Sequence, residues 1–206
     1  EATANQVNQN GGYTGMTPDD FMRYVCAIAD SVGFPKERLI LGGDHLGPLT
    51  WADLPEQEAM ANACELVRSY VAAGFTKIHI DTSMKLLGDD PSIRLSDETI
   101  ARRGALLCEV AEEGYRNYRK EHPEAQPPVY VVGSEVPIPG GTQTDETMVI
   151  TSPADCENTI AAFSRAFAAR GLQDAWTRVV GLVVQPGVEF GSSSVTDYDR
   201  EKARPL

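Results

Sequence analysis

The residues best suited to chemistry in this chain are Asp44 and His45, which stand side by side. They follow the apolar run 39–41 and a glycine pair, within the string Gly-Gly-Asp-His-Leu-Gly-Pro at 42–48. Glycine lets the backbone turn at little steric cost, and a carboxylate beside an imidazole offers an acid/base group and a metal ligand. We therefore expect Asp44 to transfer protons and His45 to bind a divalent metal ion, Zn²⁺ or Mn²⁺. The alternative is an Asx turn beside an ordinary exposed histidine.

Other polar side chains follow apolar, strand-like runs elsewhere in the chain. In a parallel β/α fold the carboxyl ends of the strands meet at one edge, where carboxylates, an imidazole and amides can hold a metal ion and a polyhydroxylated ligand. We therefore predict a sugar or sugar phosphate as the ligand, with Glu135 as a second catalytic acid/base. The candidate substrate-binding residues are Asn5, Asp81, Ser83, Gln185 and Glu189.

Three of these positions also have plain structural interpretations. Glu135 lies in a loop rich in glycine and proline, where a carboxylate commonly accepts hydrogen bonds from loop amides. Asn5 begins an amide-rich stretch that could bind sugar hydroxyls or simply form turns. His79 lies within a strand, two residues before Asp81, and we interpret it as a packed histidine rather than a ligand.

The elements that must position these residues alternate along the chain. Helical spacing of apolar residues predicts helices around 18–32, 60–71, 100–115 and 156–167, the first and last behind Thr-Pro and Ser-Pro caps. Three helices end at a glycine followed by an apolar residue, as in Schellman caps: Gly33, Gly74 and Gly171. Short runs rich in β-branched residues predict strands at 38–41, 77–80, 129–132 and 179–184, and the opening residues resemble the tail of another strand.

This alternation predicts an α/β fold, a parallel sheet with both faces covered and most simply a (β/α)8 TIM barrel. A complete barrel takes roughly 250 residues. About half of the barrel is therefore expected here, with residues 1–206 forming part of a single barrel domain whose N- and C-terminal portions are missing. The glycine-rich signatures of dinucleotide binding and of phosphate loops are absent from the sequence.

The composition of the chain limits the partners and the chemistry that we expect for it. The net charge is −12 and the basic residues are scattered, so nucleic acid is not an expected partner, and no apolar run is long enough for a membrane span. The four cysteines form no C-x-x-C pair, which favours reduced thiols in a cytoplasmic protein. No lysine lies in the interior of a predicted strand, so Schiff-base aldol chemistry has no candidate and any aldol chemistry would need a metal.

With these residues in view, the chain resembles the GatZ/KbaZ family, the non-catalytic subunit of class II D-tagatose-1,6-bisphosphate aldolase. The resemblance rests on the strings at 1–9, 11–18, 41–48, 74–81, 133–137 and 184–190. It implies an aldolase-like β/α barrel, a catalytic class II aldolase subunit as partner, and a role in galactitol and tagatose catabolism.

The resemblance also bears on individual residues. In the related catalytic class II aldolases an Asp-His pair at a strand end provides the proton-transfer carboxylate and the first zinc ligand, and Asp44 and His45 resemble this pair. Those enzymes place another ligand histidine at a later strand end, where this chain has Gln185, and an amide binds zinc poorly. This departure implies an accessory subunit.

The alternative function is a metal-dependent ketose epimerase, of the tagatose/fructose or tagaturonate type, because some relatives are similar to such enzymes. It would use Asp44 or Glu135 as the acid/base near a sugar-bound metal. An older family label, tagatose-6-phosphate kinase, finds no phosphate loop in this sequence.

Overall fold

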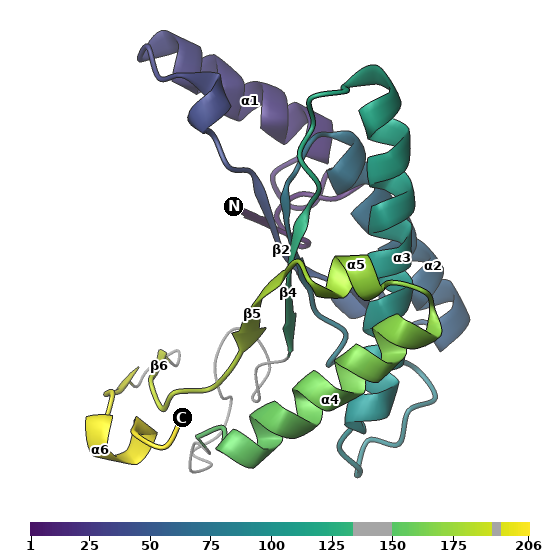
Figure 1. Ribbon diagram of the computed structural model, residues 1–206, viewed down its shortest axis with the longest axis vertical. Coiled ribbons are helices and arrows are strands. Elements are labelled where there is room, and N and C mark those ends of the chain that lie inside the picture. Colours follow the sequence, from purple (N-terminus) through teal and green to yellow (C-terminus); the bar gives the residue numbers. More distant parts are fainter. Residues whose placement is uncertain (134–149, 191–194) are drawn as a thin grey trace.

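The computed structural model shows an open parallel sheet with helices packed against it (Figure 1). It describes residues 1–133, 150–190 and 195–206, with the side chains of 189 and 190 excepted. The strand order follows the chain order, and every neighbouring pair is parallel. The strands are β1 (Ala2–Thr3), β2 (Gly42–Leu46), β3 (Lys77–Ile80), β4 (Val129–Gly133) and β5 (Val179–Val183). Successive β/α units in this order are the arrangement of a β/α barrel, so the predicted fold class is confirmed.

The four predicted helices are present, together with shorter elements. The long helices are α1 (Pro18–Ser31), α2 (Glu56–Ala72), α3 (Asp97–Glu121) and α4 (Pro153–Ala169). The shorter elements are the 3-10 turns η1 (Lys36–Arg38) and η2 (Pro48–Trp51), the helices α5 (Gln173–Trp176) and α6 (Arg200–Ala203), and an antiparallel pair, β6 (Glu189–Phe190) with β7 (Val195–Thr196).

Local sequence explains where the helices begin and end. The hydroxyls of Thr17 and Ser152 accept hydrogen bonds from the third residue of α1 and α4, completing capping boxes ahead of a proline in the first turn. Gly33, Gly74 and Gly171 have φ between 68° and 84° at the helix exits, a conformation that favours glycine. The three predicted Schellman caps are thereby confirmed.

The strand predicted at 38–41 is wrong in its position. Residues 36–38 form the 3-10 turn η1, Ile40 is 78% exposed, and the strand begins only at Gly42. The glycine pair therefore lies inside β2 instead of ending the strand before it. Packing gives the reason: a Cβ on Gly43 would lie 2.7 Å from the ring of Tyr70, so glycine admits the ring of α2 against the strand.

The sheet has two unlike faces because side chains alternate along a strand. Ile78, Ile80, Tyr130 and Val132 are almost fully buried in the core, which they share with residues of α2, α3 and α4. These helices lie together on one side of the sheet (Figure 1). The alternate residues of β3, Lys77 and His79, belong to the opposite face.

Each of the four cysteines lies in a helix and none is in a disulfide: Cys26, Cys64, Cys108 and Cys156. No helix within the described ranges has both the length and the apolar character needed to cross a membrane.

Candidate functional site

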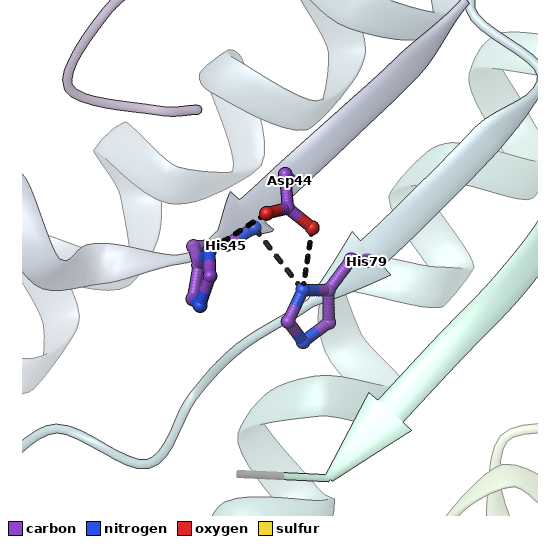
Figure 2. A group of neighbouring side chains, drawn as sticks. All are labelled: Asp44, His45 and His79. Carbon is purple, nitrogen blue, oxygen red and sulfur yellow. Dashed lines mark hydrogen bonds and ion pairs between the residues drawn. The ribbon is translucent and has the colours of Figure 1, made fainter. Parts of the chain in front are cut away.

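Asp44 lies at the centre of a cluster of basic side chains, drawn in part in Figure 2. Its Oδ2 is 3.0 Å from Nδ1 of His45, and its Oδ1 is 2.9 Å from Nδ1 of His79. The same Oδ1 accepts a hydrogen bond from Nζ of Lys77 at 2.9 Å. The Lys77 ammonium also lies 3.1 Å from the carboxylate of Glu1. One carboxylate thus binds two imidazoles and an ammonium.

A local irregularity of β2 brings Asp44 and His45 to the same place. Neighbouring residues of a strand normally point to opposite faces, so an adjacent pair cannot ordinarily share one cluster. His45, however, has φ 49°, in the left-handed region, and the register of β2 against β3 shifts between Gly43 and Leu46. Such a bulge re-aims a side chain and is common next to functional sites. It turns the His45 ring back toward Asp44.

Two members of the cluster, His79 and Lys77, were missed as site residues. His79 is buried, at 4% exposure, which agrees with the interpretation as a packed histidine, but its ring packs against Asp44 and His45. The sequence does carry a signal for it. Lys77 and His79 are two residues apart on a strand, so both lie on one face, the same face that Asp44 reaches from the neighbouring strand.

The contacts fix the charge of the carboxylate. Hydrogen bonds from His45, His79 and Lys77 hold the pKa of Asp44 well below its usual range, and they outweigh the opposing effect of its partial burial. Asp44 is therefore ionised throughout the physiological range. A carboxylate so strongly stabilised in its charged form is a weak proton acceptor.

The donor set fits a divalent metal ion. Asp44, His45 and His79 offer ligand atoms that lie within 4.8 Å of one another. Nε2 of His79 is buried and has no hydrogen-bond partner among the described residues. A buried imidazole nitrogen without a partner is costly, and a bound cation would satisfy it. Imidazole nitrogen suits Zn²⁺ and other transition metals.

The other predicted binding residues are engaged in turns near their own strands. Asp81 is buried after β3, and its Oδ1 accepts hydrogen bonds from the amide and hydroxyl of Ser83, an Asx turn. Asn5 is exposed after β1, and its Oδ1 accepts a hydrogen bond from the Thr50 hydroxyl at 3.0 Å. Both follow strands that flank β2, but neither directly contacts the Asp44 cluster in the interactions found among the described residues.

Gln185 follows β5 and is 6% exposed. Its Oε1 accepts a hydrogen bond from the backbone amide of Gly187 at 2.8 Å, and the backbone N–H of Gln185 donates to the Thr151 hydroxyl. These bonds stabilise the loop after β5. Glu135 and the side chain of Glu189 lie outside the described residues, so their predicted roles stay predictions.

Together the fold and the cluster define an α/β protein of the β/α-barrel type, with a carboxylate–histidine site at the carboxyl ends of parallel strands. The whole of 1–206 matches the model of the family described as D-tagatose-1,6-bisphosphate aldolase subunit GatZ/KbaZ-like. The chain therefore belongs to the GatZ/KbaZ-like family.

A solved structure agrees with this assignment. The chain is similar to the crystal structure of a probable tagatose 6 phosphate kinase from Sinorhizobium meliloti 1021, at 46% sequence identity and a TM-score of 0.83. The similarity covers 100% of this chain and 46% of that one. The chain thus spans less than half the length of this relative.

Proposed function

We propose that the whole protein is an accessory subunit of class II D-tagatose-1,6-bisphosphate aldolase, which binds and stabilises the catalytic subunit without cleaving the sugar bisphosphate itself. The observation that carries this proposal is the family match, which extends over all of 1–206. The substrate class expected for such a complex is a ketose phosphate.

The loop after β5 supports an accessory role. The resemblance implies that Gln185 stands where the related catalytic aldolases have a ligand histidine, and its side-chain oxygen accepts a hydrogen bond from the backbone amide of Gly187. A carboxamide is a poor zinc ligand compared with imidazole or thiolate. Among the described residues after β5, a glutamine therefore stands where the resemblance would call for a histidine.

The test is co-purification of the whole protein with a catalytic class II tagatose-bisphosphate aldolase, followed by the half-life of aldolase activity with and without it. We expect a complex and a longer half-life, and no cleavage of the bisphosphate by the protein alone. An unchanged half-life with no complex, or cleavage by the protein alone, would contradict the proposal.

A second candidate, a metal-dependent ketose epimerase, is favoured by the cluster of Asp44 with His45 and His79. A divalent cation held there would polarise a sugar carbonyl or hydroxyl and so acidify the neighbouring carbon–hydrogen bond. Lys77 and the two imidazoles keep Asp44 fixed and ionised beside that position.

The epimerase candidate is tested with the purified whole protein and Mn²⁺, Zn²⁺ or Ni²⁺, on free and phosphorylated ketohexoses. Interconversion of sugars that differ at one carbon would support it, and removal of the acid/base group, tested with Asp44→Asn and Glu135→Gln, should then reduce the rate about 10²–10⁴-fold for the variant that lacks it. Absence of turnover with all three metals would contradict it.

A further inference from the structure

We propose that His45 and His79 bind a divalent metal ion through Nε2. Asp44 is then a positioning residue: its carboxylate holds both rings by hydrogen bonds to Nδ1, and it neither binds the metal nor moves the proton. The inference deepens the second candidate function, but it rests on metal binding alone and requires no turnover. It assigns Asp44 a role different from the proton acceptor expected from the sequence.

The contacts of Asp44 leave it poorly placed as a metal ligand. Its Oδ1 already accepts from Lys77 and faces Nδ1 of His79, each at 2.9 Å, while its Oδ2 is bonded to Nδ1 of His45 at 3.0 Å. A cation bound to Oδ1 would lie next to the Lys77 ammonium and be repelled by it. We therefore assign the Asp44 carboxylate the role of a hydrogen-bond acceptor and not that of a metal ligand.

The same contacts set the tautomers of the two rings. A neutral imidazole that donates Nδ1–H to a carboxylate keeps its lone pair on Nε2, and this carboxylate–histidine arrangement orients metal ligands and raises their basicity. Figure 2 shows both rings with Nδ1 toward Asp44 and the other ring nitrogen turned away from it. In this tautomer each ring has its nitrogen lone pair on Nε2, the ring nitrogen that is turned away from Asp44.

One contact favours the opposite tautomer of His79. The backbone N–H of His45 faces Nδ1 of His79 at 3.3 Å, which would need an unprotonated Nδ1. The carboxylate contact is shorter, at 2.9 Å, and hydrogen bonds to a charged acceptor are about twice as strong as neutral ones. The charge-assisted bond therefore decides the tautomer in favour of Nδ1–H.

Burial and backbone conformation agree with a ligand role. Nε2 of His79 lies in the interior, and no described residue satisfies it. The left-handed backbone of His45 brings its ring centroid to 4.8 Å from that of His79. Two imidazole nitrogens suit Zn²⁺, Co²⁺ or Ni²⁺ better than Mg²⁺ or Ca²⁺, and they leave coordination positions for water or sugar oxygens.

The first test is calorimetric titration of the metal-free whole protein with Zn²⁺ and with Co²⁺. We expect binding that His79→Gln weakens at least 100-fold and that Asp44→Asn weakens about 10–100-fold, the usual effect of losing such a carboxylate. His122→Gln is the matched control, because His122 is an exposed histidine outside the cluster that stacks on Tyr118. Equal affinities in the wild type and His79→Gln, or no binding by the wild type, would overturn the inference.

The second test separates positioning from general stability. In ¹⁵N NMR of the imidazoles, metal-free protein should show Nδ1–H and an unprotonated Nε2 for both residues, and Zn²⁺ should shift Nε2. Asp44→Asn should alter the tautomer of at least one ring in a protein whose circular dichroism is unchanged, while Asp44→Glu should restore part of the Zn²⁺ affinity. A Zn²⁺-dependent shift at Nδ1, or an Asp44→Asn variant with unaltered tautomers and affinity, would contradict the proposal.

Failure of this inference can be distinguished from failure of the proposed function. If the His79→Gln variant binds Zn²⁺ as the wild type does but still co-purifies with the aldolase, the ligand assignment is wrong and the accessory role stands. If the wild type binds Zn²⁺ as described but forms no complex, the accessory role is wrong and the metal site stands.

Discussion

Gly47 lies against the backbone of Asp81 so closely that a Cβ on Gly47 would be 1.6 Å from the Asp81 carbonyl oxygen. Directly beside this contact, the amide of Asp81 donates to the carbonyl of Leu46 at 3.0 Å. The end of β2 that carries Asp44 and His45 is thereby held against the end of β3. Glycine is required at position 47 for this close approach of two backbones.

Gly47→Ala should therefore destabilise the fold, because the methyl group can be accommodated only by separating the ends of β2 and β3. We expect a loss at or above the upper end of the about 1–3 kcal/mol typical of overpacking, measured by urea unfolding. Gly181→Ala is the control, since its Cβ would meet Val131 at an ordinary 3.4 Å. Equal unfolding midpoints for the two variants would show that the Gly47 contact is not needed.

Arg103 should be far more important for stability than its neighbour Arg102. The Arg103 side chain is fully buried in α3 and binds Glu56 at 2.7 Å and Asp89 at 2.9 Å, so it ties α2 to the loop after β3. Arg102 pairs with the other oxygen of Glu56 but is 56% exposed.

Arg103→Ala leaves two carboxylates without their shared cation and should cost about 3–5 kcal/mol, whereas Arg102→Ala should cost about 0–1 kcal/mol. Urea unfolding measures both. We also expect faster proteolysis within 85–95 in the Arg103 variant, because Asp89 lies in that loop. Similar losses for the two arginines would contradict the role assigned to Arg103.

Much of the fold could be predicted from the sequence because its signals are local. Thr17 and Ser152 each precede a proline and stand three residues before an aspartate, so hydrogen bonds within one turn define the start of α1 and α4. The start of β2 could not be predicted in this way. Its glycine pair is typical of a turn, and only the packing of Tyr70 from α2 explains why a strand needs glycine at 43.

The site, like the fold, could be predicted where its residues are neighbours in the sequence. Asp44 and His45 are adjacent in sequence and were identified, although the bulge that lets both face one cluster is set by the pairing of β2 with β3. His79 and Lys77 join the cluster through that pairing, more than 30 positions away. Chemistry that depends on strand register is visible only once the strands are aligned.

The stability that the Asp20 carboxylate contributes at the start of α1 should be lost as the pH falls from 3.8 to about 2. Hydrogen bonds from Thr17 and then Arg23 lower the pKa of Asp20 from 3.8 to about 2. Because this value lies below that of the unfolded chain, the carboxylate stabilises the fold above pH 3.8 and the contribution is lost as the pH falls to about 2. The stability difference between wild type and Asp20→Asn should therefore shrink over this range.

The control for Asp20 is Asp19→Asn, which removes a carboxylate of the same turn that binds Arg23 but does not cap the helix. Unfolding curves at several pH values measure both differences. A difference for Asp20→Asn that stays constant from neutral pH to about pH 2 would contradict the capping role of the ionised carboxylate.

Tyr130 should be needed for a buried ion pair at the amino-terminal end of β4 and β5. Its hydroxyl donates to Glu112 of α3, whose two oxygens also bind Arg178 at 2.9 and 2.8 Å. The Arg178 guanidinium lies 5.7 Å from the centre of the Tyr130 ring. Tyr130→Phe would leave a buried carboxylate with one donor fewer, at an expected cost of about 1–3 kcal/mol. Tyr115→Phe, which loses a bond to the uncharged carbonyl of Ala125, should cost less.

The same tyrosine predicts how the fold responds to alkali. Burial raises the pKa of Tyr130 above its usual 10.0, and the nearby Cys108 and Glu112 raise it further. A group with a raised folded-state pKa stabilises the fold below its unfolded pKa, and the contribution is lost as the pH rises toward the folded value. Phenolate absorbance should therefore show Tyr130 ionising only together with unfolding, at a pH above that of exposed tyrosines such as Tyr13. A Tyr130→Phe variant that left the late phase of the phenolate titration unchanged would assign that phase to another residue and contradict the burial of this hydroxyl.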